Sequence, residues 1–165
     1  MKKLAIFLIL TVLVVAGLIL YGLFQSRLQV IGKSLTFRSA DQDQEWAQRF
    51  EAQKADMAIN ALQGTPIKNG PLGDAGNYVY REYTLMVKNP GLVDAEMVEI
   101  QIAPVAGDVL YWGESGKVDI KAGETRNIKC YLLTEGNTHN VRNFYLTYYL
   151  WGNPQEVKFT YDDTK

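Results

Sequence analysis

The N-terminal segment, residues 4–24, contains no charged side chain and directly follows Met1, Lys2 and Lys3. It reads LAIFLILTVLVVAGLILYGLF. A helix of about 20 apolar residues, rising about 1.5 Å per residue, matches the roughly 30 Å hydrocarbon core of a bilayer. We therefore predict a cytoplasmic stub at residues 1–3, a membrane-spanning helix at residues 4–24, and a water-facing remainder from residue 25 onward.

Two other interpretations of this segment remain open. A signal peptide combines a basic start, an apolar core and a small-x-small cleavage site, and Val14-x-Ala16 is the acceptable pair here. Cleavage there would leave GLILYGLF as the new N-terminus, which is still apolar, so a permanent anchor is favoured. A buried core helix would need a domain large enough to surround a helix that is apolar on every face.

The basic residues that flank the span suggest its orientation. Lys2 and Lys3 precede it, whereas Arg27, Lys33 and Arg38 follow it, so the two counts are nearly equal. The first two lysines lie closer to their end of the span, and a short stub is easily retained inside. We predict a single-pass plasma-membrane protein with a cytoplasmic N-terminus and an extracytoplasmic C-terminal domain.

Composition narrows the classes of function. The formal net charge is −1, with acidic and basic residues interspersed, which is not the electrostatic footprint of a nucleic-acid-binding protein. Cys130 is the only cysteine, so an internal disulfide is impossible. It shares the strand parity of Ile128 and Leu132, which predicts a buried core position rather than a reactive thiol.

The first part of the soluble region, residues 25–77, combines a strand, a helix and a loop. Residues 28–38 read as a strand that is interrupted near Gly32. Ser39 followed by Gln42 is a capping-box pattern, which predicts an amphipathic helix over residues 40–62. The apolar side of this helix comprises Trp46, Phe50, Met57 and Ala61. The Gly- and Pro-rich residues 64–77 predict a loop before the main sheet.

From residue 78 the apolar period changes to two. Alternating segments separated by turn residues predict strands near 83–87, 98–102, 109–112, 118–120, 128–132, 144–150 and 157–161. Short strands at this spacing are typical of an antiparallel sandwich. We assign the sandwich to residues 78–161 and a tail to residues 162–165.

Two stretches resemble a known family. Residues 83–102 (YTLMVKNPGLVDAEMVEIQI) contain a strand ending in V-x-N-x-G, and residues 118–132 (VDIKAGETRNIKCYL) contain two strands around A-G-E. Both are similar to bacterial Ig-like domains of the CARDB and fibronectin-III-like type. The resemblance implies a mainly β, antiparallel Ig-like sandwich, with the helix at 40–62 as an unusual insertion. It also implies an envelope module for adhesion or assembly, since such domains usually have that role.

The sequence does not favour catalysis, a cofactor or a metal. His139 is the sole candidate for a histidine base and lies in a polar loop. The segment 113–116 (GESG) differs from the G-x-S-x-G nucleophile elbow. The pairs Asp41/Asp43 and Asp162/Asp163 lack the spacing of a calcium loop. We predict that the protein is not an enzyme.

Surface aromatics are the remaining candidates for a binding site. If Phe144, Leu146, Tyr148 and Leu150 face the core, then Tyr145, Tyr149 and Trp151 share the opposite face, and Trp112 is a fourth candidate. Such rings stack on sugars or anchor protein partners. We predict that the apolar side of the helix at 40–62 docks on this face and covers these rings, and an exposed binding patch is the alternative. We predict a structural or protein-interaction module, with a carbohydrate- or cell-wall-binding module as the alternative.

Overall fold

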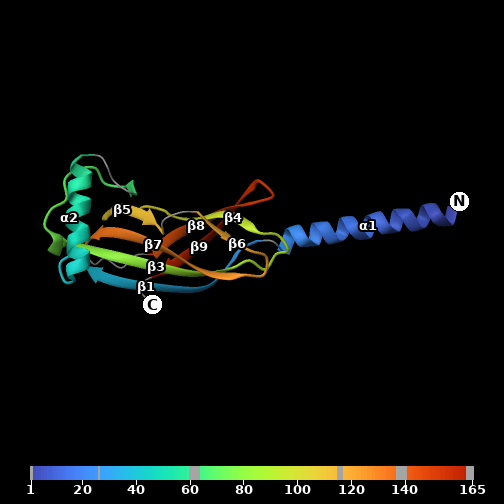
Figure 1. Ribbon diagram of the computed structural model, residues 1–165, viewed down its shortest axis with the longest axis horizontal. Coiled ribbons are helices and arrows are strands. Elements are labelled where there is room, and N and C mark those ends of the chain that lie inside the picture. Colours follow the sequence, from blue (N-terminus) through green and yellow to red (C-terminus); the bar gives the residue numbers. More distant parts are fainter. Residues whose placement is uncertain (1, 26, 60–63, 115–116, 137–140, 163–165) are drawn as a thin grey trace.

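The computed structural model describes residues 2–25, 27–59, 64–114, 117–136 and 141–162. A long N-terminal helix projects from one end of a two-sheet β domain, and a second helix crosses the opposite end (Figure 1). The first helix, α1 (Lys2–Gln25), contains a candidate span at Lys3–Gly22, none of which is buried against the rest of the chain. It is therefore not a core helix. Its length and composition suit a membrane anchor, and a signal sequence has the same properties.

The strands form two antiparallel sheets. The first sheet has the order β1 (Gln29–Ser39), β3 (Tyr78–Lys88), β7 (Thr125–Glu135), β5 (Asp108–Gly113) and β2 (Thr65–Pro66). The second has the order β6 (Val118–Ile120), β4 (Ala95–Ile102), β8 (Val141–Leu150) and β9 (Asn153–Asp162). This architecture confirms the predicted mainly β sandwich preceded by an apolar helix.

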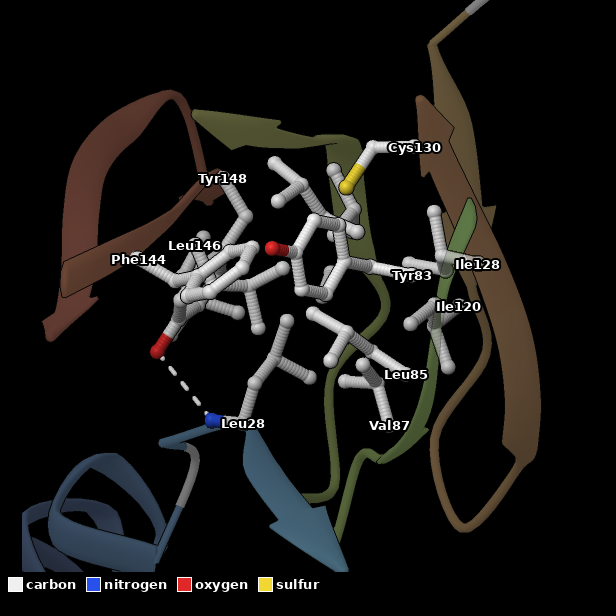
Figure 2. Packing of buried hydrophobic residues seen from close by; sticks show 14 of the residues in the cluster. Leu28, Tyr83, Leu85, Val87, Ile120, Ile128, Cys130, Phe144, Leu146 and Tyr148 are labelled. Atoms are coloured by element: carbon white, nitrogen blue, oxygen red, sulfur yellow. Dashed lines mark hydrogen bonds between the residues drawn. The ribbon is translucent and has the colours of Figure 1, made fainter. Parts of the chain in front are cut away.

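The main core lies between the two sheets, where the alternating apolar residues of β3, β7 and β8 meet (Figure 2). The fully buried ring of Tyr83 is central, with its centroid 5.0 Å from that of Phe144 and 5.7 Å from that of Tyr161. Cys130 is also fully buried beside Tyr83, as predicted, and burial raises the pKa of its thiol.

The chain enters the sandwich through a fixed contact. Just after α1, the backbone N–H of the buried Leu28 donates to the hydroxyl of Tyr148, 3.1 Å away (Figure 2). β1 then pairs with β3, with a bulge between Val30 and Gly32 that confirms the predicted interruption. The first strand is thus tied to both sheets within a few residues of α1.

The second helix, α2 (Gln44–Ala58), begins later than the capping-box pattern predicted. Asp43 is the N-cap, and its carboxylate accepts from the N–H of Glu45 at 3.0 Å. Ser39 instead ends β1, paired with Val79, so the Ser39/Gln42 prediction was wrong. The strand pairing of Ser39 and the proximity of the Asp43 carboxylate to the first free N–H groups explain the difference. Ala61, predicted to belong to the apolar side of the helix, lies outside the described residues.

The helix also docks in a different place from the one predicted. Trp46 lies 4.7 Å from Tyr80, and Phe50 lies 5.1 Å from Tyr78, between ring centroids. Both tyrosines belong to β3, so α2 covers the outer face of the first sheet and not the face that carries Tyr145. The reason is connectivity, because residues 40–43 join β1 directly to α2 and are too few to cross to the second sheet.

The segment predicted as a loop contains two short elements. β2 pairs with β5 at the edge of the first sheet. A proline is tolerated in this edge strand because one side of the strand forms no backbone hydrogen bonds to another strand. The 3₁₀ helix η1 (Ala75–Asn77) leads directly into β3. The two elements bring residues 64–77 across the end of the domain that carries α2.

Candidate functional site

The four aromatic residues predicted as a binding site do not form one site. Tyr145 and Tyr149 lie on the outer face of β8, and Tyr149 is 39% exposed. Trp151 lies beyond the end of β8, in the turn to β9, so it does not share their face as predicted. Trp112 belongs to β5 in the other sheet. Tyr145 has a charged neighbour, since the ammonium of Lys158 lies 5.6 Å from its ring centroid.

Trp112 instead lies at the edge of an aromatic cluster beneath α2. Its ring stacks on Tyr131 of β7, with centroids 5.4 Å apart and an interplanar angle of 12°. It meets Tyr80 edge to face at 5.8 Å. The guanidinium of Arg49 on α2 lies 5.9 Å from the ring centroids of both Trp112 and Tyr131, and 4.9 Å from that of Trp46. The helix thus holds a cation over a flat aromatic surface.

This cluster forms one wall of a groove of about 740 Å³ between α2, β5 and Glu99 of β4. The lining residues come from five segments and combine aromatic, amide and charged groups: Arg49, Ala52, Gln53, Asp56, Gly64, Thr65, Glu99, Tyr111, Trp112, Gly113, Glu114 and Tyr131. A flat aromatic surface edged by hydrogen-bonding groups is an arrangement suited to binding a polar ligand with apolar faces.

The tyrosines around the groove remain neutral hydroxyl groups. Burial raises the pKa of Tyr80 and Tyr111 well above the ordinary value for tyrosine. Burial, and to a lesser extent the carboxylate of Glu82, also raises the pKa of Tyr131. The Tyr80 hydroxyl donates to the side-chain oxygen of Gln53 at 2.8 Å, and that of Tyr111 donates to the carbonyl oxygen of Ile100. Both hydroxyls therefore help to fix the shape of the groove.

The charges around the groove disfavour an anionic ligand. Its described lining includes the carboxyl groups of Asp56, Glu99 and Glu114, against the one guanidinium of Arg49. The backbone N–H of Lys129 donates to the carboxylate of Glu114 at 3.3 Å, which holds one of these groups in place. A neutral, hydroxyl-rich ligand or a cationic one fits this balance better than a phosphate.

The other polar candidates have structural roles or lie outside the description. Asp41 accepts from the Ser39 hydroxyl, and Asp43 caps α2. No group of three or more His, Cys, Asp or Glu side chains within the described residues is arranged to hold a metal ion. His139, Asp163 and positions 115–116 of the GESG segment lie outside the described residues.

The groove was missed at the sequence level, although a signal existed. Tyr78 and Tyr80 have the parity opposite to that of the core residue Tyr83, and Tyr131 alternates with Cys130 and Leu132. Both patterns mark a second apolar surface on the outer face of the first sheet. The corresponding buried cluster is Ala40, Trp46, Phe50, Leu72, Tyr78, Tyr80, Val109, Leu110 and Leu133.

Comparisons with known proteins give only distant similarities. No protein-family model matches the chain, and no curated protein matches it. The chain is similar to the crystal structure of a FixG-related protein from Vibrio parahaemolyticus, with 14% identity and a TM-score of 0.36, covering 81% of this chain and 96% of the other. It is also similar to the yeast GGA1 GAE domain, with 13% identity and a TM-score of 0.36, covering 61% and 97%. Similarities this weak support no argument about the fold or the function of this chain.

Proposed function

We propose that this protein is anchored in the membrane by α1 and displays one extracytoplasmic β sandwich in the cell envelope, where it has a structural or protein-interaction role. The observation that carries the proposal is the apolar span at Lys3–Gly22, none of which is buried inside the rest of the chain, and its continuity with a separately packed β domain. Such a helix is stable in lipid and unstable in water. The charge pattern of the flanks favours the cytoplasmic N-terminus.

The outer face of the second sheet supports an interaction role. Tyr149 on β8 is exposed, and so is Met97, which lies in the bulge of β4. The residue before Met97, Glu96, pairs with Tyr149 across the two strands. β9 pairs with β8 along one side and forms the edge of the sheet. Aromatic and methionine side chains on an accessible sheet are common anchors for protein partners.

Protease treatment of intact cells tests the anchoring and the topology. We expect added protease to remove the β domain and to leave a short fragment that contains α1. Complete protection of the domain, or a mature chain that starts near Gly17, would contradict the proposed topology. Photo-crosslinking from Tyr149, with the far-end exposed residue Ile59 as a matched control, tests the interaction role.

Carbohydrate or cell-wall binding is the second candidate, favoured by the stacked Trp112–Tyr131 pair and the polar groups around it. The structure separates two aromatic surfaces, so a pair of variants distinguishes them. Loss of cell-wall binding in Trp112→Ala, with retention in Tyr149→Ala, indicates the groove. The opposite result indicates the outer face of the second sheet. Equal binding by both variants and the parent chain would contradict glycan recognition by aromatic stacking.

A further inference from the structure

We propose that the end of the β domain nearest α1 is seated in the bilayer surface, with Leu92 inserted at the hydrocarbon boundary and Trp151 at the level of the lipid headgroups. This inference rests on the proposed membrane anchoring. It adds a second membrane contact, made by the folded domain, which would fix how the domain stands on the membrane.

The depth of Leu92 follows from its position beside α1. A Cβ atom built on Gly22 would lie 3.9 Å from Cδ1 of Leu92, so the two residues lie side by side. Gly22 is the last residue of the candidate span. A span of that length covers about 30 Å, which places Gly22 at the edge of the hydrocarbon core. Leu92 is 82% exposed, so its side chain is free to meet lipid at that level.

The loop that carries Leu92 is rigid. Asn89, fully buried at the start of the β3–β4 loop, donates from its side-chain amide to the carbonyl oxygens of Val93 (2.7 Å) and Ile120 (3.0 Å). Its side-chain oxygen accepts from the N–H of Gly91 at 3.0 Å. Its backbone N–H donates to the carbonyl oxygen of Glu124 at 2.9 Å, which joins the loop to the β6–β7 connection. Leu92 is therefore held outward by a fixed loop.

Trp151 is presented by a second turn at the same end of the domain. The β8–β9 hairpin turns at the end that faces α1 (Figure 1). Close to this turn, Tyr149 pairs with Glu96, which is the second residue of β4 and so follows shortly after the loop that carries Leu92. Trp151 has φ 49° and Gly152 has φ 74°, in a two-residue turn closed by Leu150 and Asn153. Such turns favour Asn-Gly, because a bulky residue at positive φ is strained.

Trp151 is 59% exposed and its backbone is strained, so its presence at this position is not explained by the stability of the hairpin. Tryptophan is enriched at the headgroup level of membranes, because its ring is apolar while its N–H forms hydrogen bonds. The charges at this end are mixed, since Lys88 and Lys121 are accompanied by Asp94 and Glu124. We therefore expect the seating to depend on apolar insertion and to occur on neutral lipid.

Brominated lipids test the position of Trp151. The full chain is reconstituted into neutral phosphatidylcholine vesicles brominated on the acyl chains near the headgroup, which quench tryptophan only at close range. We expect a loss of emission that Trp151→Phe abolishes, because Trp46 lies on α2 and Trp112 packs beneath α2, at the opposite end of the domain. Unquenched emission from chains that float with the vesicles would overturn the inference while leaving the anchor intact.

Spin labels test Leu92 independently. Leu92→Cys and the matched control Ile59→Cys, which is 72% exposed beside α2, are labelled in the full chain. Native Cys130 is fully buried, which directs labelling to the introduced site. We expect the label at Leu92 to collide more with oxygen and less with a water-soluble nickel complex than the label at Ile59. Equal accessibility at both sites would overturn the seating. Failure of the chain to float with vesicles would instead contradict the anchor itself.

Discussion

The buried ion pair between Asp108 of β5 and Arg142 of β8 joins the two sheets and gives the sharpest stability prediction. The two guanidinium nitrogens of Arg142 lie 2.7 and 2.8 Å from the two carboxylate oxygens of Asp108. The side chain of Arg142 is 1% exposed and that of Asp108 is 0% exposed. The carboxylate also accepts from the N–H of Val105 at 2.8 Å. Asp108→Asn keeps an acceptor for Val105 but leaves the guanidinium without its counter-charge.

Removing one partner of a buried pair costs about 3–5 kcal/mol, because the remaining charge is desolvated and uncompensated. That is a large share of a total stability on the order of 5–15 kcal/mol. We expect Asp108→Asn to lower the urea midpoint of the fragment 25–165 by about 2 M, for an m-value of about 2 kcal/mol/M. Circular dichroism and tyrosine fluorescence report the transition.

The double variant Asp108→Asn/Arg142→Met separates charge from packing. Methionine fills much of the volume of the arginine and carries no charge, so the double variant should be more stable than Asp108→Asn alone. The exposed pair Lys68–Glu135 is the matched control, and Glu135→Gln should leave the midpoint unchanged within error. A loss below about 1 kcal/mol for Asp108→Asn, or no recovery in the double variant, would refute the reasoning.

The remaining predictions concern the helix, the thiol, the loop and the fragment. Trp46→Ala should lower the free energy of unfolding in urea by about 3 kcal/mol, because the nearly buried ring by which α2 contacts Tyr80 is removed, and quencher access to tyrosine fluorescence should rise. Cys130 should resist iodoacetamide in the native state, because burial raises the pKa of its thiol, and should react in denaturant; Cys130→Ala should cost about 1–2 kcal/mol. Asn89→Ala should cost about 3 kcal/mol, because three hydrogen bonds of its buried side chain are lost. The fragment 25–165 should be monomeric in sedimentation, with and without reductant; a reductant-dependent dimer would place Cys130 at the surface.

Local patterns in the sequence were sufficient for the longer strands and for the inward side of each, but not for β2, η1 or the start of α2. Apolar residues at alternate positions predicted the strands of both sheets, and parity alone placed Cys130 in the core. The interruption at Gly32 is a bulge opposite Met86. The N-P-G turn after β3 could be read from residue types, because each favours a turn conformation independently of distant contacts.

The sequence did not determine which surfaces meet. Periodicity shows that a face is apolar but not what covers it. The outer faces of both sheets carry aromatic side chains, so the sequence allowed α2 to pack on either sheet. The short connection from β1 decided that Tyr78 and Tyr80 of the first sheet are covered, and Tyr149 of the second remains exposed. Asp108 and Arg142 are 34 residues apart, and their pairing depends on how the two sheets pack face to face.

The ends of the molecule show the same division. The apolar composition of residues 4–24 determined that the first helix is able to span a membrane, because hydrophobic length is a property of the segment itself. Only the tertiary structure placed Leu92 beside Gly22 and brought the β8–β9 turn to the same end of the domain. Those positions follow from the order of the strands in the two sheets, which depends on pairing between residues distant in sequence, such as β1 with β3.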